Sequence, residues 1–504
     1  MVSASQGAQT PPEFLAATNV DGLDEVLGGG FAPNRLYLIE GAPGSGKTTL
    51  ALQFLLQGVN REEPVLYVTL SETEEELQAV ASSHGWSLDG ISIRQLVPSE
   101  GSLRGEEQYT VFHASEVELA ETLNPILADV ERLKPARVVV DSLSELRLLA
   151  GNALRYRRQI LALKQFFAGR GSTVLLLDDL TSVDRDLQVQ SLAHGVVALE
   201  QLNPEYGAER RRLRVVKYRG KKYRGGYHDY VIRQGGLKVF PRVVASEHRQ
   251  LTSRKKLSSS LKAFDELLGG GIEEGTSTLI VGAAGTGKST LAIQFAVAAA
   301  SRGQVTALFI FDESLNTLLS RAAGMSIPLS EHIDSRRIIP QEVDPAELSP
   351  GEFSHAIRNA VERDHAAIVV IDSLNGYLNA MPEERFLAIQ LHELLSYLGQ
   401  RGVATILIGA HQGLIGGAMQ TPVDASYLAD AVILIRYFEM RGEVRQAISV
   451  VKKRGGKHER SIREFRLESD GIHVGEPLTR YRGVLTGVPT VEDGELPLSQ
   501  KAKS

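Results

Sequence analysis

The sequence predicts an α/β protein made of two tandem domains, each a mostly parallel β-sheet flanked by helices. Three observations predict this fold class. The chain has 504 residues, too many for one hydrophobic core and suited to two domains of roughly 250 residues each. Short β-branched apolar runs alternate with helical patterns, as in parallel sheets whose strands are connected by helices. A glycine-rich motif also occurs twice, with its lysines at positions 47 and 288, which indicates a tandem repeat of whole domains.

The expected strands of the first half are short apolar runs. They lie near Leu36–Glu40, Val65–Leu70, Arg137–Val140, Val174–Leu177, Val196–Leu199 and Leu213–Lys217. The last strands of the half are joined by short polar turns and are expected to be antiparallel additions to the sheet. The predicted boundaries are a flexible tail over 1–12, a first domain over 13–243, a polar basic linker over 244–257, a second domain over 258–480 and a tail over 481–504.

The repeated motif has the pattern of a phosphate-binding loop, with four residues between two glycines, followed by Lys and Ser or Thr. Each copy follows an apolar run and precedes a helical run, so backbone N–H groups and a helix N-terminus would face a phosphate. Lys47 and Lys288 would reach the β- and γ-phosphates of a nucleotide. The residues expected to bind ATP are Gly41, Gly44, Ser45, Gly46, Lys47, Thr48 and Thr49 in the first half and Gly282, Gly285, Thr286, Gly287, Lys288, Ser289 and Thr290 in the second.

A Mg²⁺ site is expected beside each loop. Thr48 and Ser289 supply the hydroxyl ligand, and Asp141 and Asp372 end four-residue apolar strands, where a carboxylate can support the Mg²⁺ shell. A strand that ends in Asp is more often a plain cap, but the phosphate loop upstream in each half favours the metal role. ATP and Mg²⁺ are therefore the predicted cofactors.

Hydrolysis also needs a base to orient or deprotonate water. Glu72 follows the second strand of the first half, and Asp312 and Glu313 occupy the matching place in the second. Acidic residues are also favoured at a solvated helix start. Their recurrence at the same place in both halves favours a catalytic role.

Each half has a Lys-x-Arg sequence late in its domain, Lys217 with Arg219 and Lys452 with Arg454. Alternate residues of a strand lie on one face, so both cations could stabilise the γ-phosphate of a neighbouring subunit. A dense basic run from position 210 to 224 leaves two other readings open, a charged edge strand and contact with nucleic acid.

Composition limits the class of protein. Cysteine is absent, which excludes disulfides and thiol catalysis, and the net charge of −6 gives no overall basic field for nucleic acid. Residues 1–12 are polar, without the apolar region of a signal peptide, and no apolar run approaches the ~20 residues of a membrane span. We expect a soluble cytoplasmic protein that binds neither a membrane nor nucleic acid.

From about Phe14 to Thr490 the chain resembles the KaiC family of tandem RecA-like P-loop ATPases. The most specific stretches are the glycine triplets near residues 28–30 and 269–271, both phosphate loops, residues 438–443 leading to 451–458, and residues 482–490. The resemblance implies a two-tiered homo-hexamer with ATP at subunit interfaces, ATPase activity in the first domain and serine/threonine autokinase activity in the second. It also suggests regulatory protein partners at the C-terminal tail.

The resemblance places the paired glutamates of the family on Ser71-Glu72 and on Asp312-Glu313, so the first domain lacks one acid. The adjacent phosphate-accepting hydroxyl residues of the family fall on Ser426 and Tyr427. Autophosphorylation is therefore expected on Ser426, without the ordered two-site cycle that two such hydroxyls would allow. The alternative is that Ser426 is a surface hydroxyl without a functional role.

The leading hypothesis is an ATP-hydrolysing, self-phosphorylating hexameric switch in signalling or a clock. One alternative is a RecA/RadA-like DNA-dependent ATPase, which the acidic pI of about 6.1 disfavours. The other is a nucleotide-dependent scaffold with little turnover, which the serine at position 71 keeps open.

Overall fold

The computed structural model describes residues 15–96, 114–179, 187–204, 207–245, 255–379, 387–410, 427–486 and 490–491. The chain divides between Arg242 and Val243 into two compact units. Of the linker predicted over 244–257, residues 246–254 lie outside the described ranges. Lys256–Leu257 forms strand β10, which pairs with β11 (Ile272–Glu273) of the second unit.

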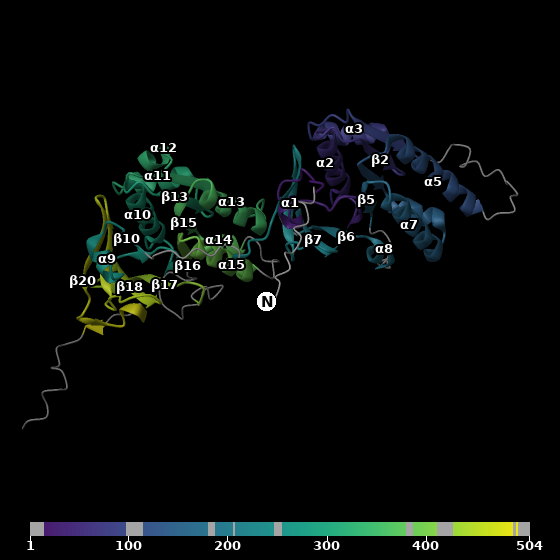
Figure 1. The fold of residues 1–504 in the computed structure, drawn as a ribbon. Helices are drawn as coiled ribbons and strands as arrows, with labels where there is room; N and C mark the ends of the chain where they lie inside the picture. Colours follow the sequence, from purple (N-terminus) through teal and green to yellow (C-terminus); the bar gives the residue numbers. More distant parts are fainter. Residues whose placement is uncertain are drawn as a thin grey trace, which may run out of the picture. The chain divides into compact units, whose positions relative to one another are not determined.

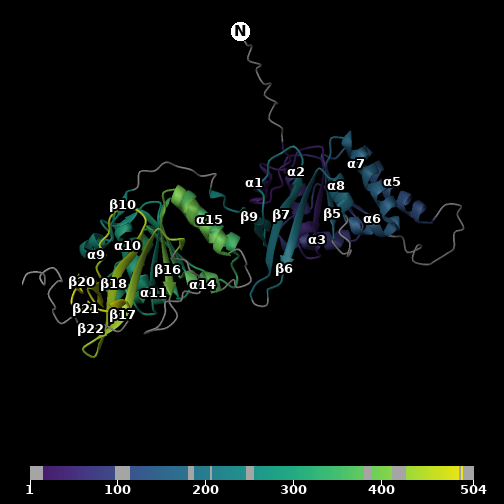
Figure 2. The same ribbon diagram turned by 90° about the horizontal axis from the view of Figure 1, so that it is seen from below.

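The first unit contains one nine-stranded sheet in the order β3-β2-β4-β5-β1-β6-β7-β8-β9. Strands β1 to β6 are parallel, and β7 to β9 are antiparallel additions that follow β6 (Figure 2). This confirms the mostly parallel sheet. The strands are β1 Leu36–Gly41, β2 Val65–Thr69, β3 Ile91–Gln95, β4 Arg137–Asp141, β5 Thr173–Asp178, β6 Gly195–Leu202, β7 Arg210–Tyr218, β8 His228–Arg233 and β9 Gly236–Phe240.

Helices cover both faces of this sheet because its central strands are apolar on both sides (Figure 1). In β1, Tyr37 and Ile39 pack on one face, whereas Leu36 and Leu38 pack on the other. The helices on the first face are α1 Leu23–Leu27, α2 Lys47–Val59 and α3 Glu74–Ser83. Those on the second are α5 Ala114–Leu133, α6 Leu143–Ala150, α7 Ala153–Ala168 and α8 Leu187–Leu192.

The second unit repeats this topology in a sheet of the order β14-β13-β15-β16-β12-β17-β18-β19-β20. Its strands are β12 Ser277–Gly282, β13 Val305–Ile310, β14 Ile338–Glu342, β15 Ala366–Asp372, β16 Ala404–Ala410, β17 Ala431–Met440, β18 Glu443–Lys453, β19 Arg463–Glu468 and β20 Gly471–Pro477. A two-stranded sheet of β21 Tyr481–Arg482 and β22 Thr490–Val491 lies near the C-terminus, with the short 3₁₀ helix η3 (Val484–Thr486) between its strands.

Helices again pack on both faces of the second sheet. One face carries α9 Lys262–Leu267, α10 Lys288–Ser301, α11 Leu315–Ala323 and α12 Leu329–Asp334. The other carries α13 Pro350–Glu362, α14 Leu374–Asn379 and α15 Leu387–Gln400. In both units the strand that precedes the phosphate loop (β1, β12) lies in the centre of the sheet. The loop itself therefore lies at the carboxyl ends of the parallel strands, where ligands bind in open α/β sheets.

Within the described part of the chain, no helix combines the length and apolar character needed to cross a lipid bilayer.

Candidate nucleotide sites

Both phosphate loops connect a central strand to a helix N-terminus. Gly46 and Gly287 immediately precede α2 and α10 and have φ of 90° and 92°, and Gly44 and Gly285 have φ of 80° and 77°. These are left-handed conformations that glycine adopts without strain. A Cβ on Gly46 would also lie 2.5 Å from Ile232 Cδ1, so a larger residue there would have to displace that side chain.

The loop lysines are buried and turned back over their own loops. Lys47 Nζ donates to the carbonyl oxygens of Gly41 (2.9 Å) and Ala42 (3.0 Å) and forms an ion pair with Asp179 Oδ1 at 2.7 Å. Lys288 Nζ donates to Ala283 O at 2.7 Å. Burial lowers the pKa of Lys288, and the carboxylates of Asp372 and Asp312 act in the opposite direction.

The predicted Mg²⁺ ligands come together in each unit. In the first, Thr48 Oγ1 donates to Asp141 Oδ2 at 3.2 Å, and Tyr67 OH donates to the same oxygen at 2.6 Å. In the second, Ser289 hydrogen-bonds Asp372, and burial raises the pKa of Asp372 to about 6. A hydroxyl and a buried carboxylate beside a phosphate loop are the oxygen donors that Mg²⁺ prefers, so these residues fit the ion.

Tyr67 distinguishes the predicted Mg²⁺ site of the first unit from that of the second. It lies on β2, and the position 241 residues later is Leu308, which has no hydroxyl. Burial raises the pKa of Asp141, whereas the hydrogen bond from Tyr67 lowers it. Tyr67 therefore stabilises the ionised form of Asp141 in the first unit only.

Glu72 lies beside this group. Its backbone is held by Thr69, whose hydroxyl accepts from Glu72 N (2.9 Å) and donates to Glu72 O (2.7 Å). Burial raises the pKa of Glu72 to about 7, and the charges of Asp141, Glu76 and Asp179 add to the effect. A carboxyl that titrates near neutral pH is suited to accept a proton from water.

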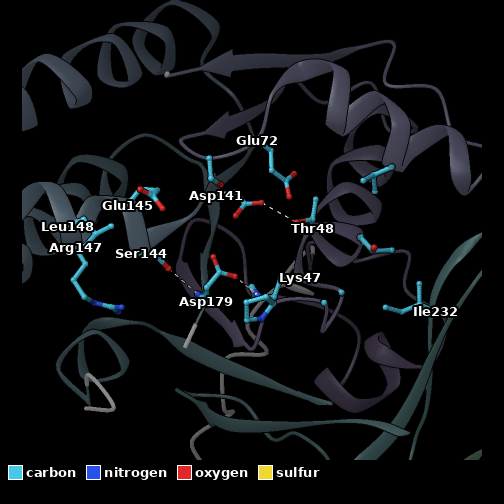
Figure 3. A pocket seen from close by; sticks show the side chains of 16 residues that line it. Lys47, Thr48, Glu72, Asp141, Ser144, Glu145, Arg147, Leu148, Asp179 and Ile232 are labelled. Carbon is cyan, nitrogen blue, oxygen red and sulfur yellow. Dashed lines mark hydrogen bonds and ion pairs between the residues drawn. The ribbon is translucent and has the colours of Figure 1, made fainter. Parts of the chain in front are cut away.

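These groups line one cavity of about 720 Å³, and Figure 3 shows Glu72, Asp141 and Asp179 directed towards Lys47 and Thr48. Its lining residues are Pro43, Gly44, Gly46, Lys47, Thr48, Thr49, Ser71, Glu72, Val80, Asp141, Ser144, Glu145, Arg147, Leu148, Asp179 and Ile232. Thr49 thus lines the cavity. In the second unit the matching Thr290 is buried.

The acids of the second unit have different partners. Glu313 accepts two hydrogen bonds from Arg321, at 2.8 and 2.7 Å, and Asp312 Oδ2 accepts one from Ser373 Oγ. The position 241 residues before Arg321 is Val80, which lines the first cavity. Glu313 therefore has a bidentate cationic partner at a position where the first unit has valine.

Lys217 and Arg219 lie at the opposite end of the sheet from the phosphate loop of their own unit. Lys217 of β7 pairs with Val196 of the neighbouring strand β6, and Val196 pairs with Leu38 of β1. Leu38 is three residues, or roughly 10 Å, before Gly41. The two cations of one chain therefore do not meet the phosphate of that chain's own loop.

Both cations instead bind carbonyl oxygens at the C-terminal end of α8, where positive charge is favourable. Lys217 Nζ donates to Gln190, Ser191 and Ala193 at 2.8, 3.1 and 2.8 Å, and Arg219 donates to Ser191 O at 2.9 Å.

The second unit repeats this arrangement. Lys452 Nζ donates to Ala429 O at 2.8 Å, and Arg454 donates to Tyr427 O at 2.9 Å. Ser426, the predicted phosphorylation site, lies outside the described residues. Its neighbour Tyr427 lies just before β17, at the same end of the sheet as Arg454.

The basic run on β7 is partly neutralised within its own sheet. Glu200 accepts from Arg212 (2.9 Å) and Tyr227 (3.0 Å) and lies 4.0 Å from Arg214, and the guanidinium groups of both arginines lie over the Tyr227 ring. This pairing favours a charged strand within the sheet over a surface for nucleic acid.

Three site residues escaped the sequence analysis: Tyr67, Asp179 as the partner of Lys47, and Arg321. A residue-by-residue comparison of the two halves would have marked Tyr67 against Leu308 and Arg321 against Val80. The pairing of Asp179 with Lys47 depends on the register of β5 with β1, which motif spacing does not contain.

Known proteins match the chain along nearly its whole length. A family model described as "ATPase: KaiC" matches residues 16–244 and again residues 257–479. The Circadian clock protein KaiC3 of Synechocystis sp. is 26% identical over 482 residues, covering 94% of this chain and 94% of that protein. The Circadian clock oscillator protein KaiC of Thermostichus vulcanus is 28% identical over 483 residues (94% and 91%), and that of Synechococcus elongatus is 27% identical over 499 residues (97% and 94%).

Proposed function

The chain belongs to the KaiC ATPase family, and from this premise we propose that it is an ATP-hydrolysing, self-phosphorylating switch that works as a homo-hexamer. The observation that carries the proposal is the recurrence of one arrangement in both units: a phosphate loop, a buried lysine, and a hydroxyl bonded to a strand-end aspartate. The proposed cofactor is Mg²⁺ with ATP as substrate, and the proposed location is the cytoplasm.

In the first unit, we assign hydrolysis to Glu72. Its carboxylate would orient a water molecule and accept its proton while the water oxygen bonds to the γ-phosphorus and ADP leaves. Lys47 would hold the β- and γ-phosphates, and Thr48 with Asp141 would hold Mg²⁺, which neutralises the charge on the phosphates. The pKa of Glu72, about 7, supports this role as base.

The position of the Lys-x-Arg cations supports the proposed assembly of several subunits. Lys217 and Arg219 lie at the amino end of the first sheet, away from their own phosphate loop, so they would serve the nucleotide of a neighbouring subunit. The same reasoning applies to Lys452 and Arg454. A monomer would therefore lack a part of each site.

In the second unit, we propose autokinase activity on Ser426, with Asp312 as the base and Glu313 beside it. Arg454 holds Tyr427 O at the amino end of the sheet, whereas Lys288 lies at the carboxyl end. The serine next to Tyr427 would then accept phosphate from the nucleotide of a neighbouring subunit. The output of the switch would be its phosphorylation state or its nucleotide occupancy, read by protein partners at the C-terminal tail.

The test is incubation of the full-length protein with Mg-ATP, with ADP release and mass spectrometry of the peptide over 421–427 as readouts. We expect ADP release together with phosphate on Ser426. Lys288→Ala should remove the phosphate and keep most ADP release, because the first unit hydrolyses ATP independently. Lys47→Ala should weaken hexamer assembly. Loss of most hydrolysis in Lys288→Ala would contradict this division of work.

The alternatives predict different results in the same assay. Stimulation of ADP release by single-stranded DNA would favour a DNA-dependent ATPase. Nucleotide binding without ADP release or phosphate incorporation would favour a scaffold.

A further inference from the structure

Asp179 is a carboxylate at the centre of the first nucleotide site. Its Oδ1 lies 2.7 Å from Lys47 Nζ, and the side chains of the two residues are 28% and 6% exposed, so water screens their interaction only partly. Its backbone N–H donates to Ser144 Oγ on α6 at 3.4 Å. Figure 3 shows Asp179 directed at Lys47 on the cavity side of the loop.

The equivalent position in the second unit is Ala410, and two independent observations establish this. Residue 178 pairs with Glu40 near the end of β1, which places residue 179 opposite Gly41, and Ala410 pairs with Gly282 at the end of β12. Asn375 Oδ1 accepts from Ala410 N at 2.7 Å, as Ser144 Oγ accepts from Asp179 N. The backbone is therefore anchored in the same way, but the second unit has no carboxylate there.

The first cavity is also acidic overall. Four of its lining residues are acids and two are bases: Glu72, Asp141, Glu145 and Asp179 against Lys47 and Arg147. A triphosphate that binds Lys47 places its terminal negative charges beside Asp179. Two negative charges a few ångströms apart in a partly screened site repel each other, so a triphosphate binds less tightly until a cation joins it.

We propose that Asp179 competes with the terminal phosphates for Lys47 in the first site, and that binding of a nucleoside triphosphate there therefore depends on a divalent cation. We call this role of Asp179 a charge filter. This inference rests on the proposed nucleotide-binding function. The second site, with Ala410 in this place, lacks the filter. The two sites of one chain thus respond differently to the free concentration of Mg²⁺.

The experiment compares Lys288→Ala with the double variant Asp179→Asn/Lys288→Ala, so that nucleotide binds at the first site alone. Dissociation constants for ATP and ADP are measured by fluorescence competition, with Mg²⁺ and with EDTA. In EDTA we expect the Asn variant to bind ATP at least about tenfold more tightly, with a smaller gain for ADP, which lacks the γ-phosphate. With Mg²⁺ the gain for ATP should largely disappear.

The converse variant inserts the filter in the second site. Ala410→Asp/Lys47→Ala should bind ATP about tenfold more weakly than Lys47→Ala in EDTA, and less so with Mg²⁺. Size-exclusion chromatography checks that each pair of variants has the same assembly state. The two comparisons predict opposite changes in ATP affinity, tighter binding for Asp179→Asn and weaker binding for Ala410→Asp. Poor folding of one variant would therefore not produce both results.

Two outcomes are decisive. Unchanged or weaker binding of ATP to the Asp179→Asn variant in EDTA would overturn the inference, and a loss of turnover at the same time would make Asp179 a base or a metal ligand. A wild-type chain that binds no nucleotide at either site would overturn the proposed function itself.

Discussion

Glu72 and Glu313 occupy equivalent positions, yet the residue eight positions further along the chain differs. Val80 lines the same cavity as Glu72, whereas Arg321 donates two hydrogen bonds to Glu313. The two hydrogen bonds from Arg321 fix the orientation of the Glu313 carboxylate. In the first unit, burial raises the pKa of Glu72 to about 7, so the charge of this residue depends on pH near neutrality.

Hydrolysis by the first unit should increase as the pH rises through about 7. The pKa of Glu72 is raised to about 7, so below that pH the carboxyl is protonated and cannot accept a proton from water. The measurement is kcat/KM for ATP against pH in Lys288→Ala, which isolates the first site. Glu72→Gln should lose at least about 100-fold in turnover. A flat pH profile in this range would exclude Glu72 as the base.

Val80→Arg should move that pH profile to lower pH. The new arginine would follow Glu72 by eight residues, as Arg321 follows Glu313, and a cation close to the Glu72 carboxylate stabilises its charged form. We expect the midpoint to fall by about one pH unit or more. Leu148→Arg, at an exposed residue of the cavity rim, is the matched control for the added charge. Equal shifts in both variants would point to a general field rather than to a pairing with Glu72.

Among single residues, the sequence predicted the phosphate-loop residues, the hydroxyl and aspartate of each Mg²⁺ site, and Glu72. Each of these is defined by its distance along the chain from a strand or a glycine. The pairings that distinguish the two sites join residues far apart in sequence. Lys47 with Asp179 and Tyr67 with Asp141 form only when the strands align in register.

Among the elements, β4 contains a buried arginine that connects three segments of the first unit. Arg137 is 1% exposed, with Nε bonded to Glu63 at 2.5 Å and Nη1 donating to the carbonyl oxygens of Ala17 (2.7 Å) and Phe54 (2.8 Å). Its guanidinium also lies 4.7 Å from the centre of the Phe54 ring. Removal of this side chain leaves the carboxylate and two carbonyls without their donor.

Arg137→Leu should therefore lower the free energy of unfolding of the first unit by about 2–4 kcal/mol, because the carbonyl oxygens of Ala17 and Phe54 lose their donor inside the protein. The Glu63 carboxylate, 30% exposed, remains accessible to water. Urea denaturation followed by circular dichroism gives this value. Arg170→Ala is the comparison, since Arg170 pairs with Glu131 at the surface and should cost less than about 1 kcal/mol. Similar losses of unfolding free energy in both variants would show that the contacts of the buried Arg137 stabilise the protein no more than a surface ion pair does.

The strands could be predicted where they are buried on both faces, and less well at the sheet edge. β1, β2, β4 and β5 are continuous apolar runs and agree with the prediction to within a residue or two. β3 reads Ile-Ser-Ile-Arg-Gln and pairs only with β2, so its alternation is short and half polar. β8 and β9 were expected only as unspecified antiparallel additions, because their residues mix polar and apolar types.

For the whole molecule, the proposed assembly leads to complementation between two inactive chains. Glu72→Gln lacks the base of its own first site but keeps its phosphate loop and Arg219, whereas Arg219→Ala has an intact loop but lacks the cation for its neighbour. Co-assembled rings should recover part of the first-unit hydrolysis, because some Arg219→Ala subunits would then have a Glu72→Gln neighbour that supplies Arg219. Both chains also carry Lys288→Ala, and ADP release is measured after mixing and reassembly. Activity no greater than the sum of the separate chains would contradict a shared site.

The equivalence of positions 179 and 410 also has a genetic consequence. Codons for alanine and aspartate can differ by a single nucleotide, so one base substitution could exchange the side chain that faces a phosphate-loop lysine while its backbone anchor stays in place. In a duplicated chain, selection can act on one copy without altering the other. Descendants of one ancestral duplication could thus acquire different sensitivities to magnesium in their two halves through separate, independent mutations.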